Sequence, residues 1–184
     1  APSCAGLVQP SVIAQRYNLP NGSAYAELLS AAGDAELAAQ ANSMAVAEFQ
    51  GQYFKHTDIE TFSTECSTSV VVKTVIGGNV ERAGIEAELD IEYIRGVSPG
   101  IDLTVIYSTS YSLLNWANNL MDLDDPPLVN SVSYGNDEAQ QTGVAYMESV
   151  NTAFMKAGTM GLSILFASGD QGVCGREGCG TGSR

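Results

Sequence analysis

The acidic residues between positions 84 and 93 have a spacing that could support acid-base chemistry. On a helix, Glu86 and Asp90 are four residues apart and share a face, which places their carboxyl groups side by side. If that face is buried, like-charge repulsion and desolvation favour a proton held between the two groups. Glu88 and Glu92 would project from nearly the opposite side, and we expect them to be exposed. The alternative is that all four acids form an ordinary solvated helix face.

Asp170 is a second candidate, because it lies in a turn of small residues directly after an apolar run. Residues 166–172 read Phe-Ala-Ser-Gly-Asp-Gln-Gly. Glycine lets a backbone approach a ligand closely, and the carboxyl group can donate a hydrogen bond when protonated or accept one when ionised. The alternative is a turn-forming aspartate whose side chain bonds only to the nearby backbone.

Strands and helices that could position these acids alternate along the chain. Apolar patterns predict strands at residues 44–49, 70–76, 101–107, 128–134 and 162–167. Helical spacing predicts helices at residues 8–19, 82–95, 112–121 and 138–156. The Ala-rich residues 25–42 fit either a helix or an irregular surface insertion.

This alternation predicts an α/β fold with a doubly wound, mostly parallel sheet and right-handed crossovers. In such sheets, functional residues gather at the carboxyl ends of the strands. We therefore expect a site built from the residues that follow positions 134 and 167. Asp170 is one of them.

The charge balance is strongly acidic, with 21 acidic and 8 basic residues, a net charge of -13 and a pI near 4.2. Nothing resembles a basic footprint for phosphates, which argues against a nucleic-acid partner. The excess charge shrinks as carboxylates protonate, which suits an acidic compartment.

No run of eighteen or more apolar residues occurs, so no membrane span is expected, and the first residues lack the pattern of a signal peptide. Asn21-Gly22-Ser23 is an N-glycosylation sequon, typical of the secretory route.

The four cysteines favour disulfides over a metal site. Cys4 and Cys66 are far apart in sequence, whereas Cys174 and Cys179 share a Gly-rich loop. His56 is the only histidine, so a zinc site would have few ligands to draw on. The pairing of the cysteines stays open at this point, and His56 is expected to be a surface residue.

Several dispersed motifs, taken together and in order, resemble the sedolisin family of serine-carboxyl peptidases, especially its lysosomal tripeptidyl peptidase branch. These motifs are Pro10-Ser11-Val12-Ile13 with Arg16-Tyr17-Asn18-Leu19, Ala83-Gly84-Ile85-Glu86 with Leu89-Asp90, Val132-Ser133-Tyr134-Gly135, Val150-Asn151-Thr152, and Leu165-Phe166-Ala167-Ser168-Gly169-Asp170. The similarity covers nearly the whole chain.

The resemblance implies a subtilisin-like fold and a Ser-Glu-Asp catalytic set. Glu86 matches the general base, Asp90 matches the acid that orients it, and Asp170 matches the aspartate of the oxyanion hole. Glu48 matches a carboxylate that extends the network in some members, and Tyr134 stands where a few bacterial relatives carry Trp. The expected activity is cleavage of peptides or proteins in an acidic compartment, secreted or lysosomal/vacuolar, as an endopeptidase or a tripeptidyl peptidase.

Two parts of the family pattern lie outside this chain. The family's nucleophile occupies a Gly-Thr-Ser segment far downstream, and Ser183 is rejected for that role because it follows Asp170 too closely. The family's calcium site also lies downstream, so calcium is implied with ligands outside the chain. We interpret residues 1–184 as the N-terminal portion of one catalytic domain with an incomplete sheet. The remainder is expected to be a second chain, held by packing and by Cys174 or Cys179.

Two other functions compete with the peptidase hypothesis. A catalytically inactive member of the family would bind peptides or another protein, and its full-length sequence would lack the serine. An unrelated α/β binding module would carry the motifs by chance, and Glu86 and Asp90 would then share no functional face.

Overall fold

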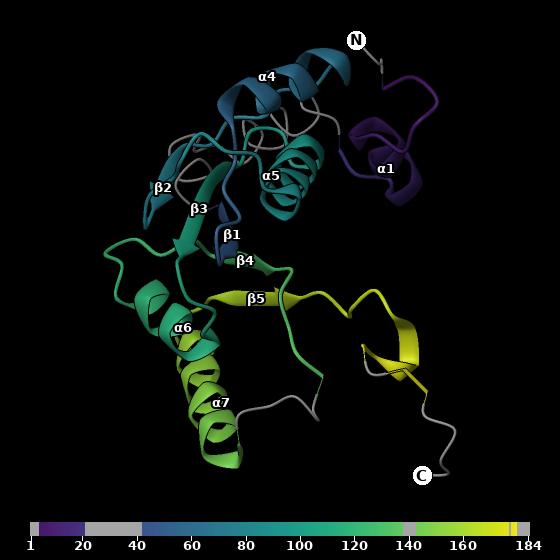
Figure 1. The fold of residues 1–184 in the computed structure, drawn as a ribbon. Coiled ribbons are helices and arrows are strands. Elements are labelled where there is room, and N and C mark those ends of the chain that lie inside the picture. The colour runs from purple at the N-terminus through teal and green to yellow at the C-terminus, as the bar shows by residue number, and fades with distance from the viewer. Residues whose placement is uncertain (1–3, 21–41, 138–142, 177, 180–184) are drawn as a thin grey trace.

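Parallel strands build the sheet at the centre of the molecule (Figure 1). The computed structural model describes residues 4–20, 42–137, 143–176 and 178–179. Within these residues, five strands pair in parallel in the order β2-β3-β1-β4-β5. Their bounds are Ser43–Phe49 for β1, Thr74–Ile76 for β2, Asp102–Ser108 for β3, Val129–Val132 for β4 and Ser163–Phe166 for β5. The predicted α/β class with a parallel sheet is confirmed.

Helices cover both faces of the sheet, as a doubly wound fold requires (Figure 1). One side carries α1 (Pro10–Tyr17), α4 (His56–Glu65) and α5 (Ile85–Val97), and the other carries α6 (Leu113–Met121) and α7 (Val144–Thr159). A short 3-10 helix, η2 (Gly172–Cys174), follows β5. None of the described helices has the length and apolar character needed to cross a membrane.

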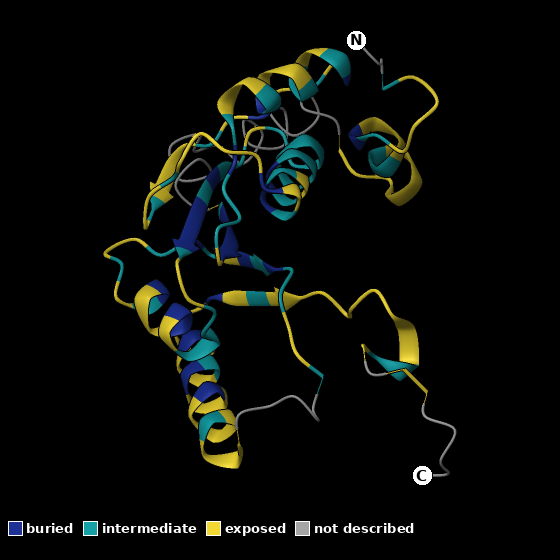
Figure 2. Ribbon diagram, in the orientation of Figure 1, coloured by how far each residue is buried: buried dark blue, intermediate teal, exposed yellow. Residues whose placement is uncertain are grey.

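Strand β1 is buried on both of its faces, and its alternate residues serve two separate cores. Ala45, Ala47 and Phe49 pack in the core beneath α6 and α7, whereas Met44 and Val46 pack in the core beneath α4 and α5. Figure 2 shows β1 and β3 as buried and much of β5 as exposed. The centre of the sheet is therefore dry, and a polar side chain placed there needs partners within the protein.

Helix α4 is the element that the sequence patterns missed. Its ten residues read His-Thr-Asp-Ile-Glu-Thr-Phe-Ser-Thr-Glu, with apolar side chains only at Ile59 and Phe62. Three β-branched threonines lower the intrinsic helix propensity, and two apolar positions are too few to define a period. Ile59 and Phe62 instead join the core formed with α5, so tertiary packing fixes this helix.

The other differences from the expected elements concern their ends. The predicted helix at residues 82–95 begins only at Ile85, and of the predicted strand at residues 70–76 only Thr74–Ile76 is a strand. Helix α7 begins at Val144, and residues 138–142 of the predicted helix lie outside the described residues. Residues 25–41 of the Ala-rich region and the sequon at Asn21 also lie outside the described residues.

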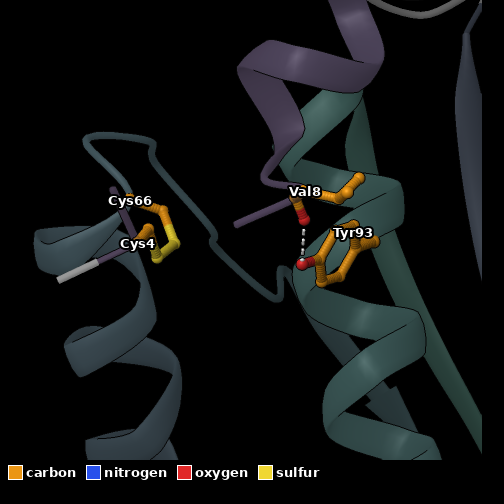
Figure 3. The surroundings of a disulfide bond; sticks show 4 residues. All are labelled: Cys4, Val8, Cys66 and Tyr93. Carbon is orange, nitrogen blue, oxygen red and sulfur yellow. Dashed lines mark hydrogen bonds between the residues drawn. A yellow bond between two sulfur atoms is a disulfide. The ribbon is translucent and has the colours of Figure 1, made fainter. Parts of the chain in front are cut away.

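Disulfides are present, as expected, and the structure gives their pairing. Cys4 bonds to Cys66 at the end of α4, and Cys174 bonds to Cys179. The suggested covalent link from Cys174 or Cys179 to a second chain is therefore wrong, because the two sulfurs bond to each other. Figure 3 shows the Cys4–Cys66 bond beside a second attachment of the N-terminal segment, in which the Tyr93 hydroxyl on α5 donates to the Val8 carbonyl at 2.8 Å.

The Cys4–Cys66 bond is predicted to contribute more to stability than the Cys174–Cys179 bond. The two bonds close loops with sequence separations of 62 and 5 residues. Chain entropy then gives contributions of about 4 and about 2 kcal/mol to the free energy of unfolding. Urea unfolding of the full-length protein with Cys4→Ser/Cys66→Ser or Cys174→Ser/Cys179→Ser measures the difference. A greater loss in the second variant would contradict this ordering.

Candidate active site

Helix α5 places two acids at the carboxyl edge of the sheet. The helix begins at Ile85, so Glu86 lies in its first turn and Asp90 one turn further on. Both side chains are half-buried. They lie on the side of α5 that faces the end of β1, because Asp90 interacts there with a buried acid of that strand.

That buried acid is Glu48, which is 0% exposed on the central strand. Glu48 alternates in phase with Met44 and Val46 and therefore points to the α5 side of the sheet. Its Oε2 accepts a hydrogen bond from the Tyr134 hydroxyl at 2.9 Å. Burial, followed by the negative charge of Asp90, raises the pKa of Glu48 to about 9, so this carboxyl group keeps its proton through neutral pH.

Asp90 connects this buried acid to the strand that follows in the sheet. Its Oδ1 accepts a hydrogen bond from the Ser133 hydroxyl at 2.9 Å, and its carboxyl group lies within electrostatic reach of Glu48. Within the described residues, Glu48 Oε1 and Asp90 Oδ2 are buried atoms that no donor reaches. A proton on Glu48 can serve both atoms, because a protonated carboxyl group donates to a neighbouring carboxylate. Burial raises the pKa of Asp90 to about 6 in spite of the hydrogen bond from Ser133.

Glu86 and Asp170 approach each other from opposite sides of the site. Asp170 follows β5 in an exposed turn, directly after Gly169, whose φ of 87° favours glycine. Burial raises the pKa of Glu86, and the nearby Asp170 carboxylate raises it further. The structure therefore brings Glu86 within electrostatic reach of both Asp170 and Asp90.

The four carboxyl groups form a graded series from the core to the surface. Glu48 is fully buried and neutral, Asp90 is mostly buried, and Glu86 and Asp170 are the more accessible ends. Such a series can hold a proton inside and still leave an outer carboxylate able to accept one from a bound group.

Comparison with known proteins finds tripeptidyl-peptidases among the relatives of this chain. The chain is 39% identical over 177 residues to tripeptidyl-peptidase 1 of Rattus norvegicus, covering 90% of this chain and 29% of that protein. It is 38% identical over 188 residues to tripeptidyl-peptidase 1 of Canis lupus familiaris, covering 96% of this chain and 30% of that protein. The chain thus spans about three tenths of the length of the curated relatives it matches.

The fold comparison agrees. A solved structure of Pseudomonas sedolisin, a serine-carboxyl proteinase in complex with two molecules of pseudo-iodotyrostatin, matches with a TM-score of 0.58 over 76% of this chain and 42% of that one. The sequence relatives are thus tripeptidyl-peptidases, and the fold is similar to that of a sedolisin. No family model matches the sequence, and the structural match, at 21% identity, supports the fold alone.

Two acids on the opposite side of α5 are less exposed than the sequence predicted. Glu88 and Glu92 were expected to be exposed, yet both are partly buried because α4 packs over them. Glu88 Oε1 accepts a hydrogen bond from the Lys55 amide at 3.3 Å. Burial, together with the charges of Glu88 and Asp58, raises the pKa of Glu92 to about 7. The prediction failed because α4 itself was missed.

The predicted surface position of His56 is confirmed, and its ring pairs with the Glu81 carboxylate. In the part of the chain that the structure describes, no three His, Cys, Asp or Glu side chains are grouped as a metal site requires. The described residues therefore do not fit the calcium site that the family resemblance implies.

Ser133 is a site residue that sequence reasoning did not assign. A signal for it existed, since it lies in the Val132-Ser133-Tyr134-Gly135 motif at the carboxyl end of β4, where functional residues were expected. Only the three-dimensional arrangement reveals that its hydroxyl group serves Asp90.

Glu92 is predicted to make this protein more stable in acid than at neutral pH. Its pKa rises from an ordinary value of 4.5 to about 7 on folding, so its stabilising effect is complete below pH 4.5 and is lost as the pH rises to about 7. Glu92→Gln removes this loss. We expect the variant to unfold at a higher urea concentration than the parent at pH 7, with the gap nearly closed at pH 4.

The matched control is Glu60→Gln on the exposed side of α4, which should show no such pH-dependent gap. Coincident unfolding curves of parent and Glu92→Gln at pH 7 would contradict the prediction.

Proposed function

We propose that this chain supplies the acid-base part of an acid-acting serine-carboxyl peptidase, in which Glu86 is the general base, Asp90 orients it and Asp170 belongs to the oxyanion hole. The observation that carries the proposal is the grouping of Glu48, Asp90 and Glu86, whose pKa values are raised by burial and by neighbouring negative charges. Perturbed acids that converge at the carboxyl edge of a parallel sheet are typical of catalytic sites.

Glu86 suits the role of base in acid. A serine hydroxyl needs a base to remove its proton, and an imidazole in that place would be charged and inert at low pH. A carboxylate still ionises there. The half-buried position of Glu86 raises its pKa, which makes it a stronger base than an exposed glutamate while it stays accessible to a group bound at the surface.

Asp90 and Glu48 act behind the base. Asp90 is fixed by Ser133 and by the protonated Glu48, and Glu48 is fixed in turn by Tyr134. This arrangement keeps Asp90 beside Glu86, where it stabilises the proton that Glu86 takes from the serine. Glu86 then gives that proton to the leaving amine, which restores its negative charge for the next step.

Asp170 supplies the oxyanion donor in this proposal. A carboxylic acid donates a hydrogen bond only when it is protonated, and an ionised carboxylate would repel the negative oxygen of a tetrahedral intermediate. The exposed turn at the end of β5 gives Asp170 access to a bound peptide carbonyl. Low pH is then required for the donor.

The nucleophilic serine and the rest of the sheet belong, in this proposal, to the remainder of the same enzyme. Ser183 lies outside the described residues. Strand β5 is the last of the described sheet, and its Leu165 and Phe166 side chains are 56% and 41% exposed. Exposed apolar side chains on an edge strand fit coverage by further elements of the domain. The substrate is then a peptide or protein in an acidic compartment, and any calcium is bound by the remainder.

Removing the base or its partner is predicted to abolish most activity. In the full-length enzyme, Glu86→Gln should lower kcat by about two to four decades, the usual contribution of a general base, and Asp90→Asn should also lower it strongly. Peptide hydrolysis across pH 3–7 measures the effect, and circular dichroism checks that the variants stay folded. Full activity in either folded variant would exclude the assignment, and a protein without any peptidase activity would favour a peptide-binding function.

Substitutions at Asp170 separate this mechanism from that of an ordinary serine peptidase. An asparagine donates a hydrogen bond at every pH, so Asp170→Asn should keep part of the activity and extend it toward neutral pH. Asp170→Ala should lose about two to three decades in kcat at all pH values. If Asp170→Ala matched the parent enzyme in acid, Asp170 would be a turn residue only.

A further inference from the structure

The first turn of α5 receives its hydrogen bond from a different part of the chain. A helix leaves its first N–H groups without partners, and a polar side chain at the N-cap commonly satisfies one of them. The N-cap of α5 is Gly84, which has no side chain. Instead, the amide oxygen of Gln52, from the turn that follows β1, accepts a hydrogen bond from the backbone N–H of Glu86 at 3.2 Å.

Close packing at Gly84 makes this contact possible. A Cβ atom at Gly84 would lie 2.6 Å from Gln52 Oε1 and 2.9 Å from the Tyr53 amide nitrogen, both too short for real contacts. The Gly84 amide also donates to the Tyr53 carbonyl at 2.7 Å. Residues 52 and 53 are thus bonded at two points to the start of α5, and a larger residue at position 84 would separate them.

The turn that carries Gln52 is itself held in place. The Gly51 amide donates to the Tyr107 hydroxyl at 2.9 Å, and the Gly51 carbonyl accepts from Arg82 Nη2 at 3.0 Å. Gly51 has a φ of 83°, which a residue with a side chain rarely adopts. Four residues before Gln52, in the same segment, stands the buried Glu48. The turn therefore connects the strand of Glu48 directly to the helix of Glu86.

We propose that Gln52 is a positioning residue, whose side-chain amide caps α5 from outside the helix and fixes Glu86 relative to Glu48 and Asp90. The inference deepens, and rests on, the proposed role of Glu86 as the base. A shift of the first turn by even about 1 Å would move the Glu86 carboxylate away from the nucleophile, and such a displacement can cost about a hundredfold in rate.

The neutrality of Gln52 also matters. Ser, Thr, Asp and Asn are the common capping residues, and an acidic side chain at this place would interact favourably with the positive end of the helix dipole. It would also set another negative charge beside Glu86, which already lies near Asp90 and Asp170. An amide caps the turn without that charge, so it does not raise the pKa of Glu86 further.

Three variants of the full-length enzyme test the proposal. Gln52→Met keeps the size of the side chain and removes the acceptor, and Gln52→Glu keeps an acceptor and adds a charge. Gln15→Met, on the exposed face of α1, is the matched control. We expect Gln52→Met to lower kcat by about ten- to a hundredfold with KM changed less than about twofold. Gln52→Glu should restore most of this kcat, and the acid limb of its pH profile should move toward higher pH because the added charge favours protonated Glu86.

Hydrogen exchange gives a readout that does not depend on activity. In Gln52→Met, the Glu86 amide should exchange faster, whereas the Asn115 amide, capped by Ser112 within α6, should be unchanged. Unchanged exchange at Glu86, or an unchanged kcat in Gln52→Met, would overturn the inference. Equal losses in both Gln52 variants with unshifted pH profiles would also overturn it. Faster exchange in an enzyme whose Glu86→Gln variant stays fully active would instead refute the proposed function and leave the cap established.

Discussion

The pairing of the Glu48 and Asp90 carboxyl groups is the interaction on which the site depends. A fully buried glutamate on the central strand would destabilise the fold if it were ionised and unpaired. Here Tyr134 donates to Glu48 Oε2, and burial together with the Asp90 charge keeps Glu48 protonated and neutral. The proton on Glu48 is then available to Asp90, so the pair connects strand β1 to helix α5, which carries both Asp90 and Glu86.

Much of the fold was predictable because its information is local. A parallel sheet buried on both faces needs continuous apolar strands, and residues 44–49 and 101–107 supply them almost to the residue. Helix α4 was not predictable in this way, since Ile59 and Phe62 give no period and the helix depends on α5 for its packing. Because α4 was not predicted, the burial of Glu92 that it causes was not predicted either.

In the candidate site, too, features within one element were predictable and contacts between distant segments were not. Helical spacing alone paired Glu86 with Asp90, because both lie on one element. Asp170 lies near Glu86 because of the order of the strands in the sheet. From the sequence, this proximity could be expected only from the rule that functional residues gather at the carboxyl ends of parallel strands. The contacts of Ser133, Tyr134 and Gln52 join segments far apart in the chain, and no spacing could reveal them.

The strand order also bears on how the site forms during folding. Strand β1 pairs with β3 and β4, whereas β2, the next strand in the chain, lies at the far end of this part of the sheet. The segment carrying Glu48 therefore has no partner strand until the chain through residue 108 is available, and its second partner follows only at residue 132. Pairings of such long sequence separation are slow, because loop-closure entropy is spent before the contacts form. Until then Glu48 is a solvated acid of ordinary strength, so the burial that raises its proton affinity coincides with closure of the central strands.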